Sequence, residues 1–359
     1  MGSLSGLKIV EMSAIGPVPL AGMLLADMGA DVVIIDKEND PWIMPHDVLR
    51  RGKTAVEVDL KSAAGVDQVK QLINQADIVI EGFRPKVMER LGLGPKEFSE
   101  VNSKLIFGRM TGWGQTGPLA ETAGHDINYI AITGALQAMG RADSAPVPPL
   151  NLVGDYGGGT MFLVMGILAA LHERQRSGQG QVVDAAITEG TANLMSMFYT
   201  MSHIGAWSTK RAANFLDSGA HFYDTYETSD QRYISLGPIE PHFYQIMLDK
   251  LGLDKQEFAD QNNQDKWPEL KQKITDVIKI KTQDQWCEIF AGSDACFAPV
   301  LDFTQAPNHA HLKNRQAYLN VDGQIQPAPA PRFSRTESKA GGPVVKDIVI
   351  EQVISKWRT

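Results

Sequence analysis

Three titratable side chains in this sequence stand where acid–base chemistry is feasible, and His125 is the first of them. It follows Gly124 and precedes Asp126, at a point where a helix is expected to begin. Imidazole titrates near neutral pH, so His125 is a candidate general acid and base. The unpaired N–H groups at a helix start favour negative charge, which makes the Asp126 amide a candidate donor to an enolate oxygen. A histidine with a purely structural role at a helix start is the plainer interpretation.

Asp155 and Glu240 are the other two candidates. Asp155 opens the segment Asp-Tyr-Gly-Gly-Gly before a long apolar stretch, so a helix N-cap is its simplest role. The glycines also let a ligand approach the backbone closely, which suits a second acid–base group. Glu240 precedes Pro241 and in isolation is an exposed loop carboxylate. Beside His125 it could instead orient the ring and stabilise the imidazolium.

The elements that must position these residues alternate between strand and helix in the first part of the chain. We expect strands at 7–12, 31–36, 55–60, 77–81 and 105–110, with helices at 17–28 and 63–75. This alternation predicts a large doubly wound, Rossmann-like α/β domain with a mostly parallel sheet. The first strand–helix turn lacks the glycine pattern of dinucleotide sites, which disfavours NAD and FAD. The sequence has no P-loop and no cluster of histidines and cysteines with metal-ligand spacing.

Changes in pattern along the chain predict four segments. Residues 1–187 form the large α/β domain, which ends with a strand at 181–187, and residues 188–216 form a helical linker. A hairpin at 221–227 and 232–236 opens a smaller α+β domain over 217–320, with helices near 242–251, 267–278 and 282–290. Residues 321–359 form a strap and a C-terminal segment that returns to the large domain, with a helix near 344–357.

Composition excludes several classes of function. The 359-residue chain carries a formal charge of −8, which argues against a general nucleic-acid binder. Basic residues nevertheless concentrate in the first ninety positions, where strand ends and loops of such a sheet bind ligands, and they suit a polyphosphate such as 3′-phosphorylated ADP. The two cysteines form no disulfide framework, the N-terminus has no secretory pattern, and the apolar run 161–171 is too short to span a bilayer. We expect a cytoplasmic protein without a membrane partner. The basic cluster comprises Lys37, Arg50, Arg51, Lys53, Lys61, Arg84, Lys86 and Arg90.

Over nearly its whole length the chain resembles the α-methylacyl-CoA racemases, a branch of the CoA-transferase family III superfamily. The most specific motifs are GRMTGWGQTGP at 108–118, AGHDINYIAITGAL at 123–136 and NLVGDYGGG at 151–159. GQGQVVDAAITEG at 178–190, NFLDSGAHFYDTYETSD at 214–230 and GPIEPHFY at 237–244 add to them. Several such motifs in the same order are far more specific than any one of them.

The resemblance implies an isomerase, a racemase or epimerase of fatty-acid metabolism that interconverts (R)- and (S)-2-methylacyl-CoA through an enolate. His125 with Glu240 would serve one face of the α-carbon and Asp155 the other, with the enolate oxygen at the Asp126 amide. The thioester acidifies the α-carbon, so no metal or redox cofactor is required. The family also implies an interlocked homodimer. The positions that match coenzyme A contacts are Lys37, Val58, Asp59, Leu60, Lys61, Arg84 and Arg90 for the nucleotide, with Gly124, Ile127, Asn128 and Tyr129 along the pantetheine and acyl end.

Two other functions suit parts of the same pattern. In a CoA-transferase of the superfamily, Asp155 would attack the thioester and form an acyl-aspartyl anhydride. A non-catalytic acyl-CoA-binding protein would need the basic cluster but no titratable groups. Neither needs His125, Asp155 and Glu240 together, so the sequence favours the racemase. The preferred acyl chain is left open.

Overall fold

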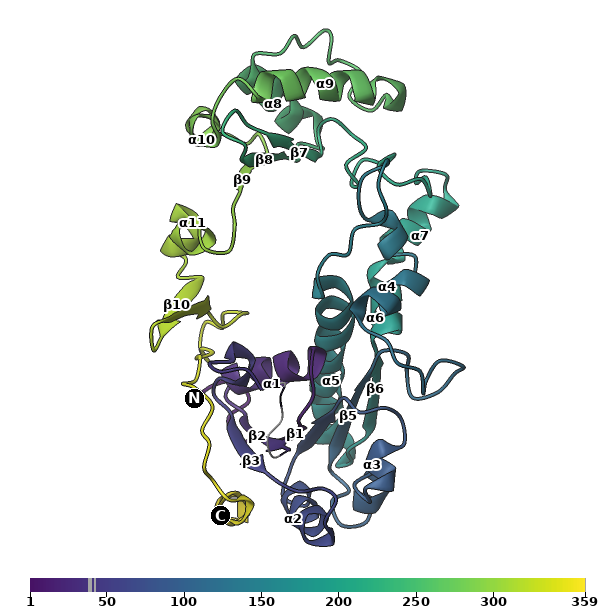
Figure 1. Cartoon of the computed structure of the whole chain (residues 1–359), viewed down its shortest axis with the longest axis vertical. Coiled ribbons are helices and arrows are strands. Elements are labelled where there is room, and N and C mark those ends of the chain that lie inside the picture. Colours follow the sequence, from purple (N-terminus) through teal and green to yellow (C-terminus); the bar gives the residue numbers. More distant parts are fainter. Residues whose placement is uncertain (38–40, 42, 359) are drawn as a thin grey trace. The chain divides into compact units, whose positions relative to one another are not determined.

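The computed structural model describes residues 1–37, 41 and 43–358 (Figure 1). Two compact units make up the chain. Unit 1 comprises residues 1–133, 149–195 and 311–359, and unit 2 comprises residues 134–148 and 196–310. Arg141 holds the short insertion 134–148 to the rest of unit 2 through its ion pair with Asp224 (2.6 Å). The domain limits expected after residues 187, 216 and 320 stay predictions.

Unit 1 is built on a six-stranded parallel sheet with the order β3-β2-β1-β4-β5-β6. The chain runs outward from β1 to β3, returns to the other side of β1 for β4, and then runs outward again. The order therefore reverses between β1 and β4, which is where doubly wound sheets bind ligands. The predicted α/β class is confirmed. The strands are β1 (Lys8–Met12), β2 (Asp31–Asp36), β3 (Thr54–Glu57), β4 (Ile78–Glu81), β5 (Ile106–Thr111) and β6 (Val182–Ala186).

Helices cover both faces of this sheet, because successive apolar strand residues point to opposite sides. On one face Val10 and Val33 pack with α2 (Ala63–Ile73) and α12 (Ile350–Arg358). On the other face Ile9 and Val32 pack with α1 (Pro17–Asp27) and α5 (Met161–Ser177). The expected C-terminal helix is present, and the Nε1–H of Trp357 donates to Asp31 Oδ2 at 3.0 Å. The short helix α3 (Val87–Arg90) follows β4.

The segment that contains Asp155 differs from the expectation. Residues Leu152–Thr160 form wide helical turns with π geometry, in which the Tyr156 N–H donates to the Asn151 carbonyl at 3.2 Å. These turns run directly into α5, so Asp155 lies inside a helical segment and the N-cap interpretation is wrong. By length and composition alone, the continuous helix Leu152–Ser177 could cross a membrane, with a mean hydropathy of 1.4 in its most apolar window. Its inner side, which includes Leu163 and Ile167, packs on the sheet as a core helix does.

Unit 2 contains the expected hairpin and a third antiparallel strand. The strands β7 (Asp224–Glu227), β8 (Tyr233–Leu236) and β9 (Phe297–Val300) are paired in this order. The core of unit 2 includes Tyr244 and Trp286 from the helices that follow β8. Those helices are α8 (Pro241–Leu251), α9 (Trp267–Ile278) and α10 (Gln283–Phe290), as the sequence predicted. The α-helices and strands of either unit not yet named are α4 (Asp126–Ile132), α6 (Ile187–Leu194), α7 (Ser196–His203), α11 (Ala310–Asn314), β10 (Tyr318–Val321) and β11 (Gln324–Pro327).

Candidate active site

A cavity of about 530 Å³ opens in unit 1 at the carboxyl ends of β1, β4 and β5. Its walls come from the turn that begins α1, the loop 82–85 after β4, the segment 110–113 and the loop 120–125. Asn151, Asp155 and Ile187 complete the lining. Because β1 and β4 are the strands between which the sheet order reverses, the cavity occupies the expected ligand position of a doubly wound sheet.

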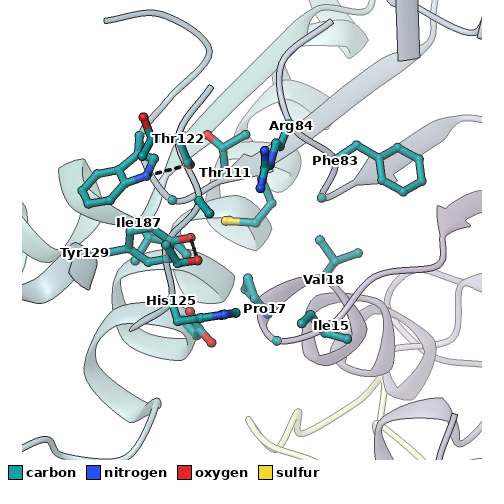
Figure 2. Close-up of a pocket in the computed structure, with 18 of the residues that line it drawn as sticks. Ile15, Pro17, Val18, Phe83, Arg84, Thr111, Thr122, His125, Tyr129 and Ile187 are labelled. Carbon is teal, nitrogen blue, oxygen red and sulfur yellow. Dashed lines mark hydrogen bonds between the residues drawn. The ribbon is translucent and has the colours of Figure 1, made fainter. Parts of the chain in front are cut away.

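His125 lies at the N-terminus of a helix, as the sequence predicted. It immediately precedes α4, its N–H donates to Asn128 Oδ1 at 3.1 Å, and its carbonyl accepts the N–H groups of Asn128 and Tyr129 (2.8 and 3.2 Å). These bonds fix the backbone and leave the exposed imidazole to the cavity. Figure 2 shows the ring reaching toward Pro17 at the start of α1, while Arg84 points into the same space.

Asp155 faces the same cavity from the wide helical turns. Its Oδ2 accepts a long hydrogen bond from Asn151 (3.5 Å). Gly16, with φ of +74°, turns the chain against this carboxylate, and a Cβ at Gly16 would lie 3.0 Å from Asp155 Oδ2. Burial raises the pKa of Asp155, the negative charge of Asp126 raises it further, and Asn151 and His125 act in the opposite direction. The cavity therefore holds an imidazole and a carboxyl that retains its proton more readily than an ordinary aspartate.

Trp113 and Tyr129 form an aromatic wall beside His125 that the sequence did not predict. The rings of Trp113 and Tyr129 form a T-shaped pair, with centroids 4.8 Å apart and an interplanar angle of 86°. The Tyr129 hydroxyl donates to the Gly124 carbonyl, and Trp113 Nε1–H donates to the Thr122 carbonyl at 3.1 Å. A Cβ at Gly112 would lie 2.0 Å from the Tyr129 ring, so a glycine there makes room for this wall. The Gly-Trp-Gly motif was the available signal, but only the fold brings it to Tyr129.

Half of the predicted basic cluster has other partners. Arg50, Arg51 and Lys53 are buried, and each forms an ion pair inside unit 1. The pairs are Arg50 with Asp36, Arg51 with Asp27 (2.5 Å) and Lys53 with Glu11 (2.6 Å). Lys86 pairs with Glu121 on the surface at 2.9 Å. The first three cations therefore stabilise the fold, and their interpretation as phosphate ligands is wrong.

Except for Arg90, the predicted coenzyme A contacts fall into two groups. Arg84, Gly124 and Tyr129 line the cavity, and the exposed Ile127 and Asn128 lie beside it on α4. The second group lies at the carboxyl ends of β2 and β3, outside the cavity lining. Lys37 follows β2, and the turn 58–61 after β3 is held by the Lys61 N–H, which donates to Asp59 Oδ1 at 2.9 Å. Val58 is buried in the core, Leu60 is half-buried, and Arg90 is exposed on α3.

Glu240 is exposed and lies in unit 2, directly before α8. Its pairing with His125 stays a prediction. Among residues 1–37, 41 and 43–358, no three His, Cys, Asp or Glu side chains are grouped so that they could hold a metal ion.

Comparisons with known proteins agree with this geometry. The profile of CoA-transferase family III matches residues 4–345. The alpha-methylacyl-CoA racemase of Mus musculus is 43% identical over 334 residues, which are 93% of this chain and 87% of the mouse protein. The racemase of the same name from Homo sapiens is 41% identical over 335 residues, with the same two coverages. A crystal structure of a CAIB/BAIF family protein from Brucella suis superposes with a TM-score of 0.84 over 99% of both chains, and its 23% identity supports the fold alone.

Proposed function

This chain belongs to CoA-transferase family III, and we propose that it interconverts the (R) and (S) enantiomers of 2-methylacyl-CoA thioesters by moving the α-proton from one face to the other. The observation that carries the proposal is the presence of His125 and Asp155 in the lining of one cavity. A 1,1-proton transfer needs two such groups, one to remove the proton and one to return it.

The difference between the two groups suits a reversible reaction. From one enantiomer, His125 takes the α-proton as a base, the C–H electron pair passes into the thioester as an enolate, and Asp155 delivers its own proton to the opposite face. From the other enantiomer the roles reverse. The raised pKa of Asp155 favours the protonated form that the first direction needs. The thioester supplies the acidity of the α-carbon, so this chemistry requires no metal or redox cofactor.

The start of α4 is the proposed position of the enolate oxygen. The Asp126 amide is the first N–H of this helix, beside His125, where unpaired N–H groups stabilise negative charge. Arg84 points into the cavity and is the proposed partner of a coenzyme A phosphate or carbonyl. The remaining coenzyme A contacts are assigned, as part of the same proposal, to Lys37, the turn 58–61, Arg90 and the exposed face of α4.

A homodimer is part of the proposal. Met161, Met165 and Leu168 are 46, 58 and 36% exposed and form an apolar face along α5. Contiguous apolar surface of this kind is typical of a protein interface. We assign this face to a second copy of the chain, and we assign Glu240 the role of a carboxylate that stabilises the protonated His125 ring.

CoA transfer through an acyl-aspartyl anhydride is the second candidate. It would use Asp155 as an ionised nucleophile. It has no need of His125, and the presence of that imidazole in the same cavity lining supports proton transfer instead.

Proton exchange in heavy water tests the proposal. The protein is incubated with one enantiomer of a 2-methylacyl-CoA in D₂O, and NMR follows α-deuterium uptake and configuration together. Deuterium uptake with loss of configuration is the expected result. An α-proton that stays in place, with coenzyme A passing to an added free carboxylic acid, would replace the racemase by the transferase. Neither reaction with several acyl chains would leave a binding protein.

A further inference from the structure

The carboxylate of Asp126 joins the two segments that carry the acid–base groups. Asp126 directly follows His125 as the first residue of α4, and only 6% of its surface is exposed. Its Oδ1 accepts the backbone N–H of Asp155 at 2.6 Å. The main chain at Asp155 is therefore tied to the residue next to His125, and this hydrogen bond helps to fix the spacing between the two groups.

Gly154 allows this bond to form. It is buried, and a Cβ at this position would lie 2.3 Å from Asp126 Oδ1. Any other residue at 154 would push the carboxylate away from the Asp155 N–H. The glycine before Asp155 therefore makes space for a side chain of the protein itself.

The second oxygen of Asp126 adds an electrostatic effect. Oδ2 is buried and has no hydrogen-bond partner among the residues that the structure describes. A carboxylate whose charge no cation neutralises acts strongly on a neighbour in a poorly solvated site. In accord with this, Asp126 is the largest influence after burial that raises the pKa of Asp155.

We propose that Asp126 is a positioning residue for the reaction: its carboxylate holds Asp155 beside His125 through the backbone and favours the protonated form of the Asp155 side chain. The inference rests on the function proposed above. It concerns the Asp126 side chain and is separate from the role of the Asp126 amide toward the enolate. The side chain acts through Asp155 and contacts no reacting atom.

Several charged or titratable groups occupy the elements that pack around Asp155. His125 and Tyr129 face it from the α4 region, and Arg84 lines the same cavity. The pKa of the Tyr129 phenol is raised first by burial and then by the negative charge of Asp155. The titratable groups farther along the packed elements are Asp27 of α1, His172, Glu173, Arg174 and Arg176 in the last turns of α5, Asp184 of β6 and Glu189 of α6.

Asp126→Asn separates charge from anchorage, because the amide oxygen can still accept the Asp155 N–H. kcat/KM is measured against pH for both enantiomers in Asp126→Asn, in Asp126→Ala and in the matched control Asp67→Asn, an exposed position on α2. We expect the limb that reports Asp155 to move to lower pH in both directions of reaction for Asp126→Asn. Asp126→Ala also loses the anchor, so its kcat falls roughly 10²-fold, and Asn restores most of that loss. The control follows the wild-type profile.

A rate that falls equally at every pH in Asp126→Asn, or a limb that does not move, would overturn the inference. A wild-type protein without α-proton exchange would instead refute the proposed function. If Asp126→Asn does not fold, ¹³C NMR titration of the wild type replaces it. The Asp155 carboxyl, identified by its absence in Asp155→Asn, must titrate at higher pH in the wild type than in Gly154→Ala, whose Cβ would displace the Asp126 carboxylate, and equal titration in the two proteins contradicts the inference.

Discussion

His125 and Asp155 share a cavity but differ in what surrounds them. His125 is exposed, with its backbone N–H bonded to Asn128 at the start of α4, whereas Asp155 is half-buried beside a second carboxylate. The site is thus asymmetric, because burial and a neighbouring negative charge raise the pKa of Asp155. The sequence predicted both residues as acid–base candidates because the signals for them are local. It could not identify the influence of Asp126 on Asp155, since that depends on a contact between residues 29 positions apart.

Removing one of the two groups should uncouple exchange from inversion. In Asp155→Asn, His125 can still take the α-proton from its own face and return deuterium to it, so exchange with retention persists for one enantiomer. Racemisation should fall by roughly 10²–10⁴-fold. His125→Ala should show the converse with the other enantiomer. NMR of the α-carbon configuration in D₂O measures both, with coenzyme A binding as the control for folding. Near-normal racemisation by either variant would contradict its assignment.

The sheet and its helices were predictable because their signals are contiguous. The apolar runs at 31–36 and 77–81 became buried strands, and the strand–helix alternation placed the cavity at the reversal of strand order. The wide turns around Asp155 were not predictable, because a glycine run before an apolar stretch is equally compatible with a capped helix. The role of Lys53 was also hidden, since its partner Glu11 lies 42 residues away in the sequence, on β1.

A substitution of Lys53 tests whether this lysine stabilises the packing of strands and helices or binds a phosphate of the ligand. Its ammonium is buried between β1 and α1, donating to Glu11 (2.6 Å) and to the Pro19 carbonyl (2.9 Å). Lys53→Met leaves Glu11 buried without its partner, so the free energy of unfolding should fall by about 3–5 kcal/mol. Adding Glu11→Gln should recover part of the loss. Chemical denaturation measures this cycle. Unchanged stability together with weaker coenzyme A binding would restore the phosphate role.

At the scale of the whole molecule, the exposed apolar face of α5 bears on assembly. If Met161, Met165 and Leu168 form a subunit interface, Met165→Glu should place a charge there and convert the dimer to a monomer or weaken it strongly. Light scattering during gel filtration measures the mass. Lys70→Glu, a half-buried change on α2 away from this face, is the matched control. A wild-type protein that is monomeric at micromolar concentration would exclude the dimer.

The core of unit 2 makes the stability of the molecule depend on pH. His221 is fully buried, its Nε2 lies 2.6 Å from the Tyr244 hydroxyl, and burial lowers its pKa from 6.5 to about 4. Between pH 4 and 6.5, His221 therefore binds a proton in the unfolded chain but not in the folded protein. Stability from this group is complete above pH 6.5 and is lost as pH falls toward 4, by about 3 kcal/mol.

Comparing wild type with His221→Gln isolates this effect. The slope of the unfolding free energy against pH between 4 and 6.5 should be smaller in the variant, whatever its absolute stability. Denaturant unfolding at several pH values gives both slopes. Equal slopes would mean that His221 is protonated in the folded protein as readily as in the unfolded chain.

Asp126 Oδ1 accepts its hydrogen bond from the main-chain N–H of Asp155 and not from the Asp155 side chain. The hydrogen bond that anchors the backbone at position 155 therefore does not depend on which side chain stands there. A designer could exchange that side chain for an amide, a hydroxyl or a thiol while keeping the scaffold and the imidazole opposite it. A catalyst for interconverting mirror images would then become a starting point for reagents that deuterate or deprotonate one enantiomer alone.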